Sequence, residues 1–130
     1  MATKKILYVD DDQDDRDFLR EAFAAVDKDA ELLLAENGVQ ALHTLEGLAR
    51  AESLPCLVVL DLNMPQMDGK TTLARIKSHP RLNDLSVMIF SSSSNPNDRS
   101  FFNRQGVEMI TKPTEYTELE TIARHMLALC

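Results

Sequence analysis

Positive charge is scarce in this sequence. The 130 residues contain 14 Lys and Arg against 21 Asp and Glu, which gives a formal net charge of −7. Proteins that bind nucleic acids or anionic membrane surfaces usually carry a basic face, so this balance argues against both functions. Long apolar runs are also missing, since the longest are of strand length and too short for a transmembrane helix. The first residues lack the apolar stretch and the small-residue cleavage site of a signal peptide.

Cysteine is nearly absent as well. Cys56 lies in an apolar run that predicts a buried strand, and Cys130 lies beyond the last predicted helix. We expect the two positions to be badly placed for pairing and Cys130 to carry a free thiol. Two unpaired thiols fit a reducing compartment, so we predict a cytoplasmic protein.

Short apolar runs alternate with amphipathic segments along the whole chain. Helices are predicted where apolar residues recur at helical spacing, as at Phe18, Leu19, Ala22 and Phe23. Strands are predicted where the runs are rich in Val, Ile and Leu, at 4–9, 31–35, 56–60, 85–90 and 107–111. This alternation predicts an α/β fold: a doubly wound parallel sheet of five strands, flanked by five helices. The length fits one such domain over residues 1–130.

Local signals also mark individual helices. Asn95 followed by Pro96 is a typical helix start, and Thr114 is predicted to cap the last helix. Phe101 and Phe102 cannot both face the core from one helix, because adjacent residues point about 100° apart. We therefore expect one of the two rings to lie at the surface as a contact patch.

Polar side chains end four of the predicted strands. In an open parallel sheet, ligands bind outside the carboxyl ends of the strands, where the strand order reverses. If the order is 2-1-3-4-5, the first and third strands are neighbours there, and Asp10, Asp11 and Asp61 crowd into one crevice. Ser91 and Lys112 follow the fourth and fifth strands and would face the same crevice.

This set of residue types suits phosphoryl transfer. Crowded carboxylates repel one another unless a divalent cation or a lysine neutralises them. Mg²⁺ prefers carboxylate and other oxygen ligands and leaves room for phosphate oxygens. Asp61 would be the nucleophile of aspartyl-phosphate chemistry, with Lys112 and Ser91 contacting the phosphoryl group.

Each of these residues has a plainer interpretation when taken alone. An acidic cluster is most often a solvated helix amino terminus, and an acid at a strand end can simply cap a turn. Lys112 could be a surface lysine and Ser91 a loop residue. The joint arrangement at four strand ends favours a site, but it does not extend to Asp12, Asp14 and Asp15, which we expect to be solvated.

Four motifs together resemble the receiver domain of bacterial two-component response regulators, of the CheY-like single-domain type. These motifs are ILYVDDD, VVLDLNMPQMDG, FSSS and ITKP, and the resemblance covers about residues 4 to 129. It implies a flavodoxin-like fold and a role for each polar strand end. The implied roles are phosphoacceptor for Asp61, Mg²⁺ positioning for Asp10, Asp11 and the backbone carbonyl of Asn63, switch hydroxyl for Ser91 and ionic partner for Lys112.

The resemblance also sets expectations near the last strand. The peptide before Pro113 is often cis in this family, and we expect the same here. The family's switch aromatic lies three residues before the lysine, where this chain has Met109. Methionine can repack, because it is flexible and polarisable, but it cannot reproduce the inward rotation of a ring. A weaker similarity in DLNMP and SSSSNPNDR points to stand-alone regulators paired with bacterial phytochrome kinases.

The function implied is a phosphoacceptor signalling switch, not an enzyme beyond catalysis of its own phosphorylation and dephosphorylation. The phosphoryl group would come from a phosphohistidine on a sensor histidine kinase or a histidine phosphotransfer protein. No output domain is expected, so the signal would pass by contact with a downstream protein. A homodimer could form through the fourth helix, fifth strand and fifth helix, where Phe101 or Phe102 is expected to be exposed near Met109.

Two other functions remain open from the residues alone. A small aspartyl-phosphate hydrolase could use Asp61, but Asn63 stands where such enzymes place a second acid. A binding-only module of the same fold would need no phosphorylation, and the intact acidic pair, Ser91 and Lys112 count against it. A flavin site is disfavoured, because the loop after the first strand is packed with acids.

Overall fold

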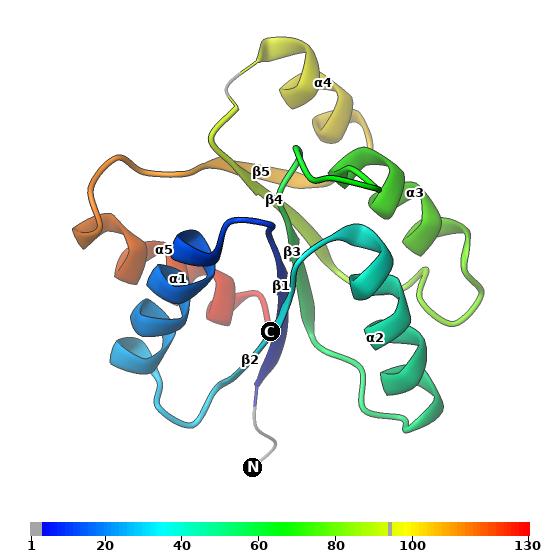
Figure 1. Ribbon diagram of the computed structural model, residues 1–130, viewed down its shortest axis with the longest axis horizontal. Helices are drawn as coiled ribbons and strands as arrows, with labels where there is room; N and C mark the ends of the chain where they lie inside the picture. The colour runs from blue at the N-terminus through cyan, green and yellow to red at the C-terminus, as the bar shows by residue number, and fades with distance from the viewer. Residues whose placement is uncertain (1–3, 94) are drawn as a thin grey trace.

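The computed structural model describes residues 4–93 and 95–130, and there five strands alternate with five helices as the sequence predicts. Figure 1 shows their arrangement, with the sheet between two layers of helices. The elements are β1 Lys5–Val9, α1 Gln13–Val26, β2 Glu31–Ala35, α2 Gly38–Arg50, β3 Leu57–Leu60, α3 Gly69–Ser78, β4 Val87–Ser91, α4 Pro96–Arg104, β5 Glu108–Thr111 and α5 Thr117–Ala128.

The sheet is parallel throughout and has the predicted order β2-β1-β3-β4-β5. Helices α1 and α5 cover one face, and α2, α3 and α4 cover the other (Figure 1). The chain reverses its direction of travel across the sheet between β1 and β3, which pair directly, with Val9 opposite Leu60. The loops after these two strands therefore open side by side, and a crevice is expected at this point of a doubly wound sheet.

Successive residues of the central strands point to opposite faces and fill two separate cores. In β1, Leu7 and Val9 pack against the layer of α2, α3 and α4, whereas Ile6 and Tyr8 pack against α1 and α5. Every residue of β3 and β4 is buried. This double burial explains why both strands read as unbroken apolar runs.

Helix ends agree with the local signals at two positions and disagree at a third. Asn95 caps α4, as predicted; Asp12 is exposed, as predicted, and also caps α1. The prediction for Thr114 is wrong: α5 starts at Thr117, after an N-cap at Tyr116 that makes no side-chain cap bond. The Tyr116 ring lies 4.2 Å from the ring of Phe18 on α1, centroid to centroid. This tertiary contact positions the first turn of α5. Within the described residues, no helix has both the length and the apolar character needed to span a bilayer.

The prediction that Cys56 and Cys130 do not pair is also wrong. They form a disulfide across 74 residues of sequence, with their Cα atoms 5.2 Å apart. Packing of α5 along the sheet brings its carboxyl end beside the amino end of β3, which no local pattern reveals.

The peptide before Pro113 is not cis, contrary to the expectation from the resemblance; cis peptide bonds are absent among the described residues. The trans isomer of an X–Pro bond is intrinsically favoured by about 0.5–1 kcal/mol.

The surface ring expected on α4 is only partly exposed. Phe102 is fully buried, and Phe101 is half-buried beneath the Lys70 ammonium, 4.9 Å from the ring centroid. The lysine stem and its charge cover the ring, because a cation is attracted to an aromatic face. An exposed phenylalanine therefore no longer supports a contact patch on this helix.

Candidate functional site

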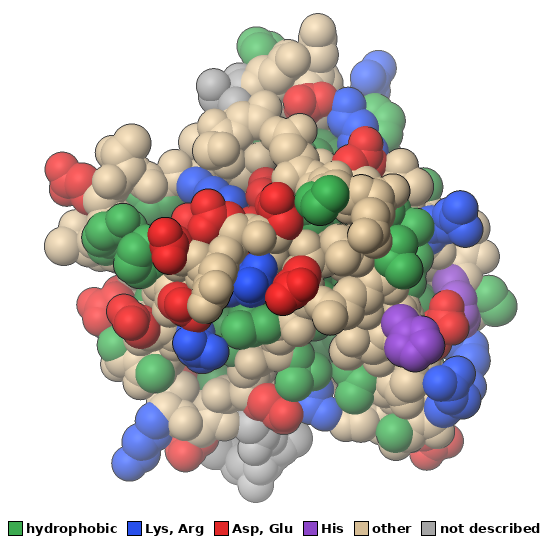
Figure 2. Space-filling model, in the orientation of Figure 1, with side chains coloured by type: hydrophobic (Ala, Val, Ile, Leu, Met, Phe, Trp, Pro, Cys, Tyr) green, Lys and Arg blue, Asp and Glu red, His purple; other side chains and the backbone are tan. Residues whose placement is uncertain are grey.

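Three carboxylates meet where β1 and β3 end. Asp10 and Asp11 follow β1, Asp61 follows β3, and one carboxylate oxygen from each lies within 4.8 Å of the others. Asp10 is fully buried and Asp61 is 7% exposed, whereas Asp11 is exposed. In Figure 2, acidic side chains gather on the face that carries the start of α1. The predicted crowding of acids at the crevice is thus present.

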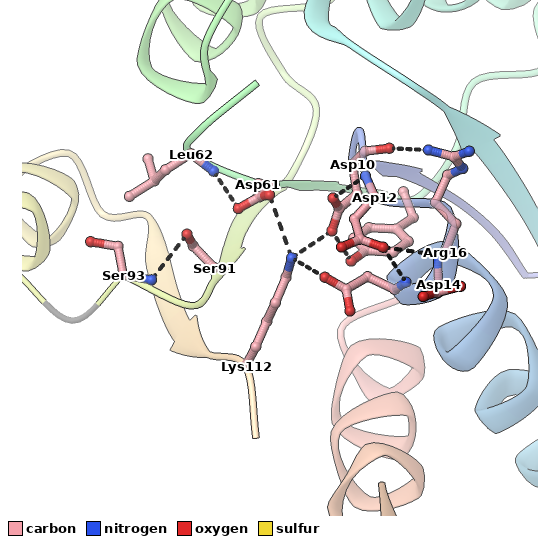
Figure 3. A network of polar contacts seen from close by, with 11 residues as sticks. Asp10, Asp12, Asp14, Arg16, Asp61, Leu62, Ser91, Ser93 and Lys112 are labelled. Atoms are coloured by element: carbon pink, nitrogen blue, oxygen red, sulfur yellow. Dashed lines mark hydrogen bonds and ion pairs between the residues drawn. The ribbon is translucent and has the colours of Figure 1, made fainter. Parts of the chain in front are cut away.

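The Lys112 ammonium lies at the centre of this acidic group (Figure 3). Its Nζ is 2.6 Å from Asp10 Oδ2, 2.8 Å from Asp15 Oδ2 and 3.4 Å from Asp61 Oδ2. The lysine follows β5, and its backbone N–H donates to the Ser91 carbonyl at 2.9 Å, which extends the pairing of β4 and β5. Lys112 therefore starts at the end of β5, and its side chain reaches past β4 to the acids at the ends of β3 and β1.

Asp10 is held by hydrogen bonds on both carboxylate oxygens. The Tyr8 hydroxyl donates to Oδ2 at 2.5 Å, and the Asp12 backbone N–H donates to Oδ1 at 3.0 Å. Arg16 on α1 donates to the Asp10 carbonyl at 2.7 Å and reaches Glu36 after β2 at 3.7 Å. These contacts compensate the burial of a full charge, which would be costly without partners.

The electrostatic environment of Asp61 opposes its ionisation. Burial and the nearby Asp10 charge raise the pKa of the Asp61 carboxyl, against the opposing effects of Lys112, the Ser91 hydroxyl and the Leu62 N–H. An acid with a raised pKa is a more basic carboxylate once ionised. The crevice thus holds a carboxylate whose charge an incoming cation would stabilise.

Two neighbours keep their protons firmly. Burial lowers the pKa of the Lys112 ammonium. Hydrogen bonds to Asp10 and Asp15 and the charges of Asp10 and Asp61 raise this pKa by more than burial lowers it, so the net shift is upward. Burial and the Asp10 carboxylate raise the pKa of the Tyr8 hydroxyl. Lys112 is therefore a permanent positive charge at neutral pH, and Tyr8 is a permanent hydrogen-bond donor to Asp10.

Ser91 completes the far side of the crevice. It is the last residue of β4, is fully buried, and accepts a hydrogen bond from the Ser93 N–H at 3.3 Å. Figure 3 shows Asp61 between Ser91 on one side and Asp10 on the other. The Asp61 carboxylate itself accepts the N–H of Leu62 at 2.8 Å. A hydroxyl and an ammonium thus approach Asp61 from neighbouring strands.

The loop after β3 is shaped by a glycine. A Cβ at Gly69 would lie 2.4 Å from the Asp61 carbonyl oxygen, so only glycine lets α3 start this close to the acid. Asn63 is exposed on the loop and lines a cavity of about 120 Å³ together with Leu62, Asp68, Lys70 and Asp98.

Sequence reasoning missed three residues of this site. Asp15 was expected to be solvated; its side chain is 35% exposed, but it also shares Lys112 with Asp10, which was not predicted. Its place on the first turn of α1 gives no signal for a partner that follows β5. Tyr8 could have been found, since residues two apart in a strand share a face and Tyr8 therefore points the same way as Asp10. Arg16 reads as an ordinary helix-surface arginine.

The donor set fits a hard divalent cation. Carboxylate oxygens are the ligands that Mg²⁺, Ca²⁺ and Mn²⁺ prefer. Asp11 is exposed, and Asp10 Oδ1 accepts only one N–H among the described contacts. The cluster of Asp10, Asp11 and Asp61 could hold a metal ion, which would then lie beside the buried Asp61 carboxylate.

Comparison with known proteins identifies relatives of nearly the whole chain. Residues 6–124 match the family described as the response regulator receiver domain. Response regulator Rcp1 of Synechocystis sp. is 34% identical over 97 residues, which cover 73% of this chain and 66% of Rcp1. The matched part thus spans just under two thirds of that relative's own length.

Solved structures of two regulators have the same fold. The phosphorylated cyanobacterial phytochrome response regulator RcpA superposes with a TM-score of 0.84 at 34% identity, covering 95% of this chain and 91% of RcpA. The Mn²⁺-bound form of Rcp1 superposes with a TM-score of 0.80 at 30% identity, covering 94% and 90%. By their descriptions, one relative is phosphorylated and the other binds a divalent metal.

Proposed function

Because this chain belongs to the family of response regulator receiver domains, we propose that it is a phosphoacceptor switch that takes a phosphoryl group on Asp61. The observation that carries the proposal is the position of Asp61: it lies 7% exposed at the end of β3, 3.4 Å from the Lys112 ammonium and within the acidic cluster. A buried basic carboxylate beside a fixed cation is suited to bind and accept a phosphoryl group.

The proposed donor is a phosphohistidine of a sensor histidine kinase or a histidine phosphotransfer protein. A carboxylate oxygen of Asp61 attacks phosphorus, an O–P bond forms, the N–P bond breaks, and the leaving imidazole nitrogen takes a proton from water. Lys112 and the Ser91 hydroxyl bind the transferred oxygens, which replace the carboxylates as partners of these groups. Positioning and charge neutralisation supply most of the catalysis in such transfers.

The proposed metal is Mg²⁺. The residues that would hold it are Asp10, Asp11 and Asp61, together with the backbone carbonyl of Asn63. Neutralisation of charge on the phosphoryl oxygens is the chemistry that the ion supplies when bound. The mutual proximity of the three carboxylates and the Mn²⁺ bound by the relative Rcp1 support this assignment.

The proposed output is a protein contact made by one receiver domain in the cytoplasm, on the face formed by α4, β5 and α5. Arg99 on α4 donates to the Met109 carbonyl and to the Thr111 hydroxyl, each at 3.0 Å, so α4 is held on β5. On the same face, His125 of α5 lies 2.9 Å from Glu108 of β5. Hydrogen bonds of this kind can switch between two arrangements when phosphorylation shifts the equilibrium between two conformations of the domain.

Met109 is the residue through which this face would sense the site. It is 7% exposed in the core between β5 and the helices α2, α3 and α4. We propose that the flexible Met109 side chain repacks when Ser91 moves toward the phosphoryl group. A homodimer through the same face would be one form of output, and light scattering with and without beryllofluoride measures it. An unchanged mass contradicts the dimer.

Substitution of the acceptor tests the proposal directly. Asp61→Asn keeps the shape of the side chain but removes its nucleophilic charge. With acetyl phosphate or a phosphorylated kinase as donor and Mg²⁺ present, we expect wild type to gain the mass of one phosphoryl group and the variant to gain none. Asp84→Asn makes the same change at an exposed acid that does not belong to the acidic cluster. It is the matched control and should behave as wild type. Phosphorylation of Asp61→Asn at the wild-type rate contradicts the proposal.

The two alternative functions have their own readouts. Steady turnover of a generic phosphate ester would favour an aspartyl-phosphate hydrolase, for which Asn63 supplies no general acid or base. Failure of the wild-type chain to bind Mg²⁺ at millimolar concentration would favour a binding-only module. Neither has a contact in the structure that favours it over the phosphoacceptor.

A further inference from the structure

The disulfide between Cys56 and Cys130 links β3 to α5 at the amino edge of the sheet, and a second contact links them at the carboxyl edge. Cys56 immediately precedes β3, and Cys130 follows α5, so their disulfide links the amino end of the strand to the carboxyl end of the helix. At the carboxyl edge of the sheet, Asp61 at the end of β3 contacts Lys112, which leads into α5. Strand β3 and helix α5 are thus connected at both of their ends.

The contact at the amino edge is built and not incidental. A Cα separation of 5.2 Å lies within the usual range for a disulfide, about 4.4–6.8 Å. The neighbouring Lys4 ammonium donates to the Leu127 carbonyl at 3.1 Å, so a second contact holds the end of α5 at the same place. Cys56 is kept in register by its backbone N–H, which donates to the Lys5 carbonyl at 2.8 Å.

The two cysteines differ in exposure. Cys130 is exposed, and Cys56 is half-buried at the edge of the core of α1 and α5. A solvent thiol can approach the bond from the side of the exposed residue, while the half-buried partner stays in place to close the ring again. This difference in exposure suits a reversible thiol–disulfide exchange site.

We propose that Cys56 and Cys130 form a reversible redox site, which exchanges with small disulfides and dithiols and fastens α5 to β3 when oxidised. With glutathione disulfide as oxidant, the Cys130 thiolate attacks one of its sulfurs, a mixed disulfide forms and one glutathione thiolate leaves. The Cys56 thiolate then attacks the Cys130 sulfur and displaces the second glutathione. Two protein thiols become one disulfide, and glutathione disulfide becomes two glutathione thiols. A dithiol reductant reverses both steps.

The oxidised bond acts on α5 as a whole. The helix buries Leu119, Ala123, Met126 and Leu127 against the sheet, and this packing, the Lys4 contact and backbone hydrogen bonds hold its last turn when the bond is open. Closing the bond removes chain entropy from the unfolded state and prevents the last turn from fraying. The site therefore sets how firmly α5 is attached, independently of whether Asp61 accepts a phosphoryl group.

The experiment equilibrates the full chain in glutathione buffers from reducing to oxidising and follows three quantities. Trapping with iodoacetamide and mass spectrometry should show two alkylated thiols at the reducing end, and none at the oxidising end, in a monomer two hydrogens lighter. The melting temperature should be about 10 °C higher in the oxidised state. Amide exchange in the last turn of α5 should slow on oxidation.

Cys130→Ser is the matched control, because the exposed position carries little risk to folding; Cys56→Ser is the second variant. Both should melt at one temperature in all buffers, close to that of the reduced wild type. Two freely alkylated cysteines in oxidising buffer would overturn the proposal, as would a disulfide that forms only between two chains. A bond that a dithiol cannot open without unfolding the protein would also overturn it.

Discussion

The Lys112 ammonium lies closer to Asp10 than to Asp61, at 2.6 Å against 3.4 Å. The lysine therefore serves first as the counter-ion of the buried acid at the end of β1 and only second as a neighbour of the proposed acceptor. A divalent cation that binds Asp10 must compete with this contact, while a phosphoryl group on Asp61 would offer Lys112 a new partner. The position of one ammonium thus couples the metal site, the acceptor and the last strand.

Replacement of Lys112 by alanine should tighten divalent cation binding and weaken the metal-free fold. The ammonium repels a cation at the same carboxylates, so its loss should raise the affinity for Mg²⁺ at least about threefold in calorimetric titration. Without the cation, a buried Asp10 lacks its counter-ion, so the melting temperature in chelator should fall and be restored by Mg²⁺. Lys77→Ala, at an exposed position on α3, should change neither quantity. Unchanged or weaker cation binding in Lys112→Ala would show that the ammonium does not compete.

Two acids on the same turn of α1 separate local from long-range charge effects. Asp15 lies 2.8 Å from Lys112, whereas the adjacent Asp14 is exposed and contributes only its backbone N–H to the cap. Asp15→Asn removes a competitor for Lys112 and one negative charge near the cluster, and both changes should weaken Mg²⁺ binding, by roughly twofold or more. Asp14→Asn makes the same change in net charge and should have a smaller effect. Equal effects would mean that only the overall field matters.

Two glycines should respond to alanine with opposite signs. At Gly69 an added Cβ would lie 2.4 Å from the Asp61 carbonyl oxygen, so the substitution should cost about 1–3 kcal/mol in denaturant unfolding. It should also lower the rate of phosphorylation, because the loop after β3 must shift. At Gly47, within α2, a Cβ meets no atom within 4 Å, so alanine should add about 0.5–1 kcal/mol of stability. A Gly69→Ala variant as stable as wild type would contradict the close approach.

The raised pKa of Asp61 predicts a pH-dependent stability difference. A carboxyl whose pKa is higher in the folded than in the unfolded state favours folding while protonated, and this contribution is lost as pH rises through the folded pKa. Asp61→Asn should therefore melt several degrees above wild type at pH 7.5 in chelator, and the gap should shrink as the pH is lowered toward the unfolded pKa. Mg²⁺ should also narrow the gap at neutral pH, because the cation stabilises the wild type, with three carboxylates, more than the variant, which keeps two. A gap independent of pH would show that burial does not penalise the Asp61 charge.

The sequence by itself determined the architecture, because the signals are local. Runs such as 57–60 are apolar on both faces, as expected of a strand between two helical layers, and their alternation with amphipathic segments indicates a doubly wound sheet. The acids at the ends of β1 and β3 were predicted to meet for the same reason, since neighbouring parallel strands end at one edge.

Only the tertiary structure decided which groups share a proton, a charge or a bond across the fold. Asp15 joins Lys112 because the lysine side chain reaches across the crevice to the first turn of α1, and Cys56 joins Cys130 because α5 ends beside the start of β3. Tyr116, which precedes the first residue of α5, has its ring in tilted contact with that of Phe18. Each of these contacts joins residues far apart in the chain, and their distance depends on how whole helices pack on the sheet, which no short pattern of residues encodes.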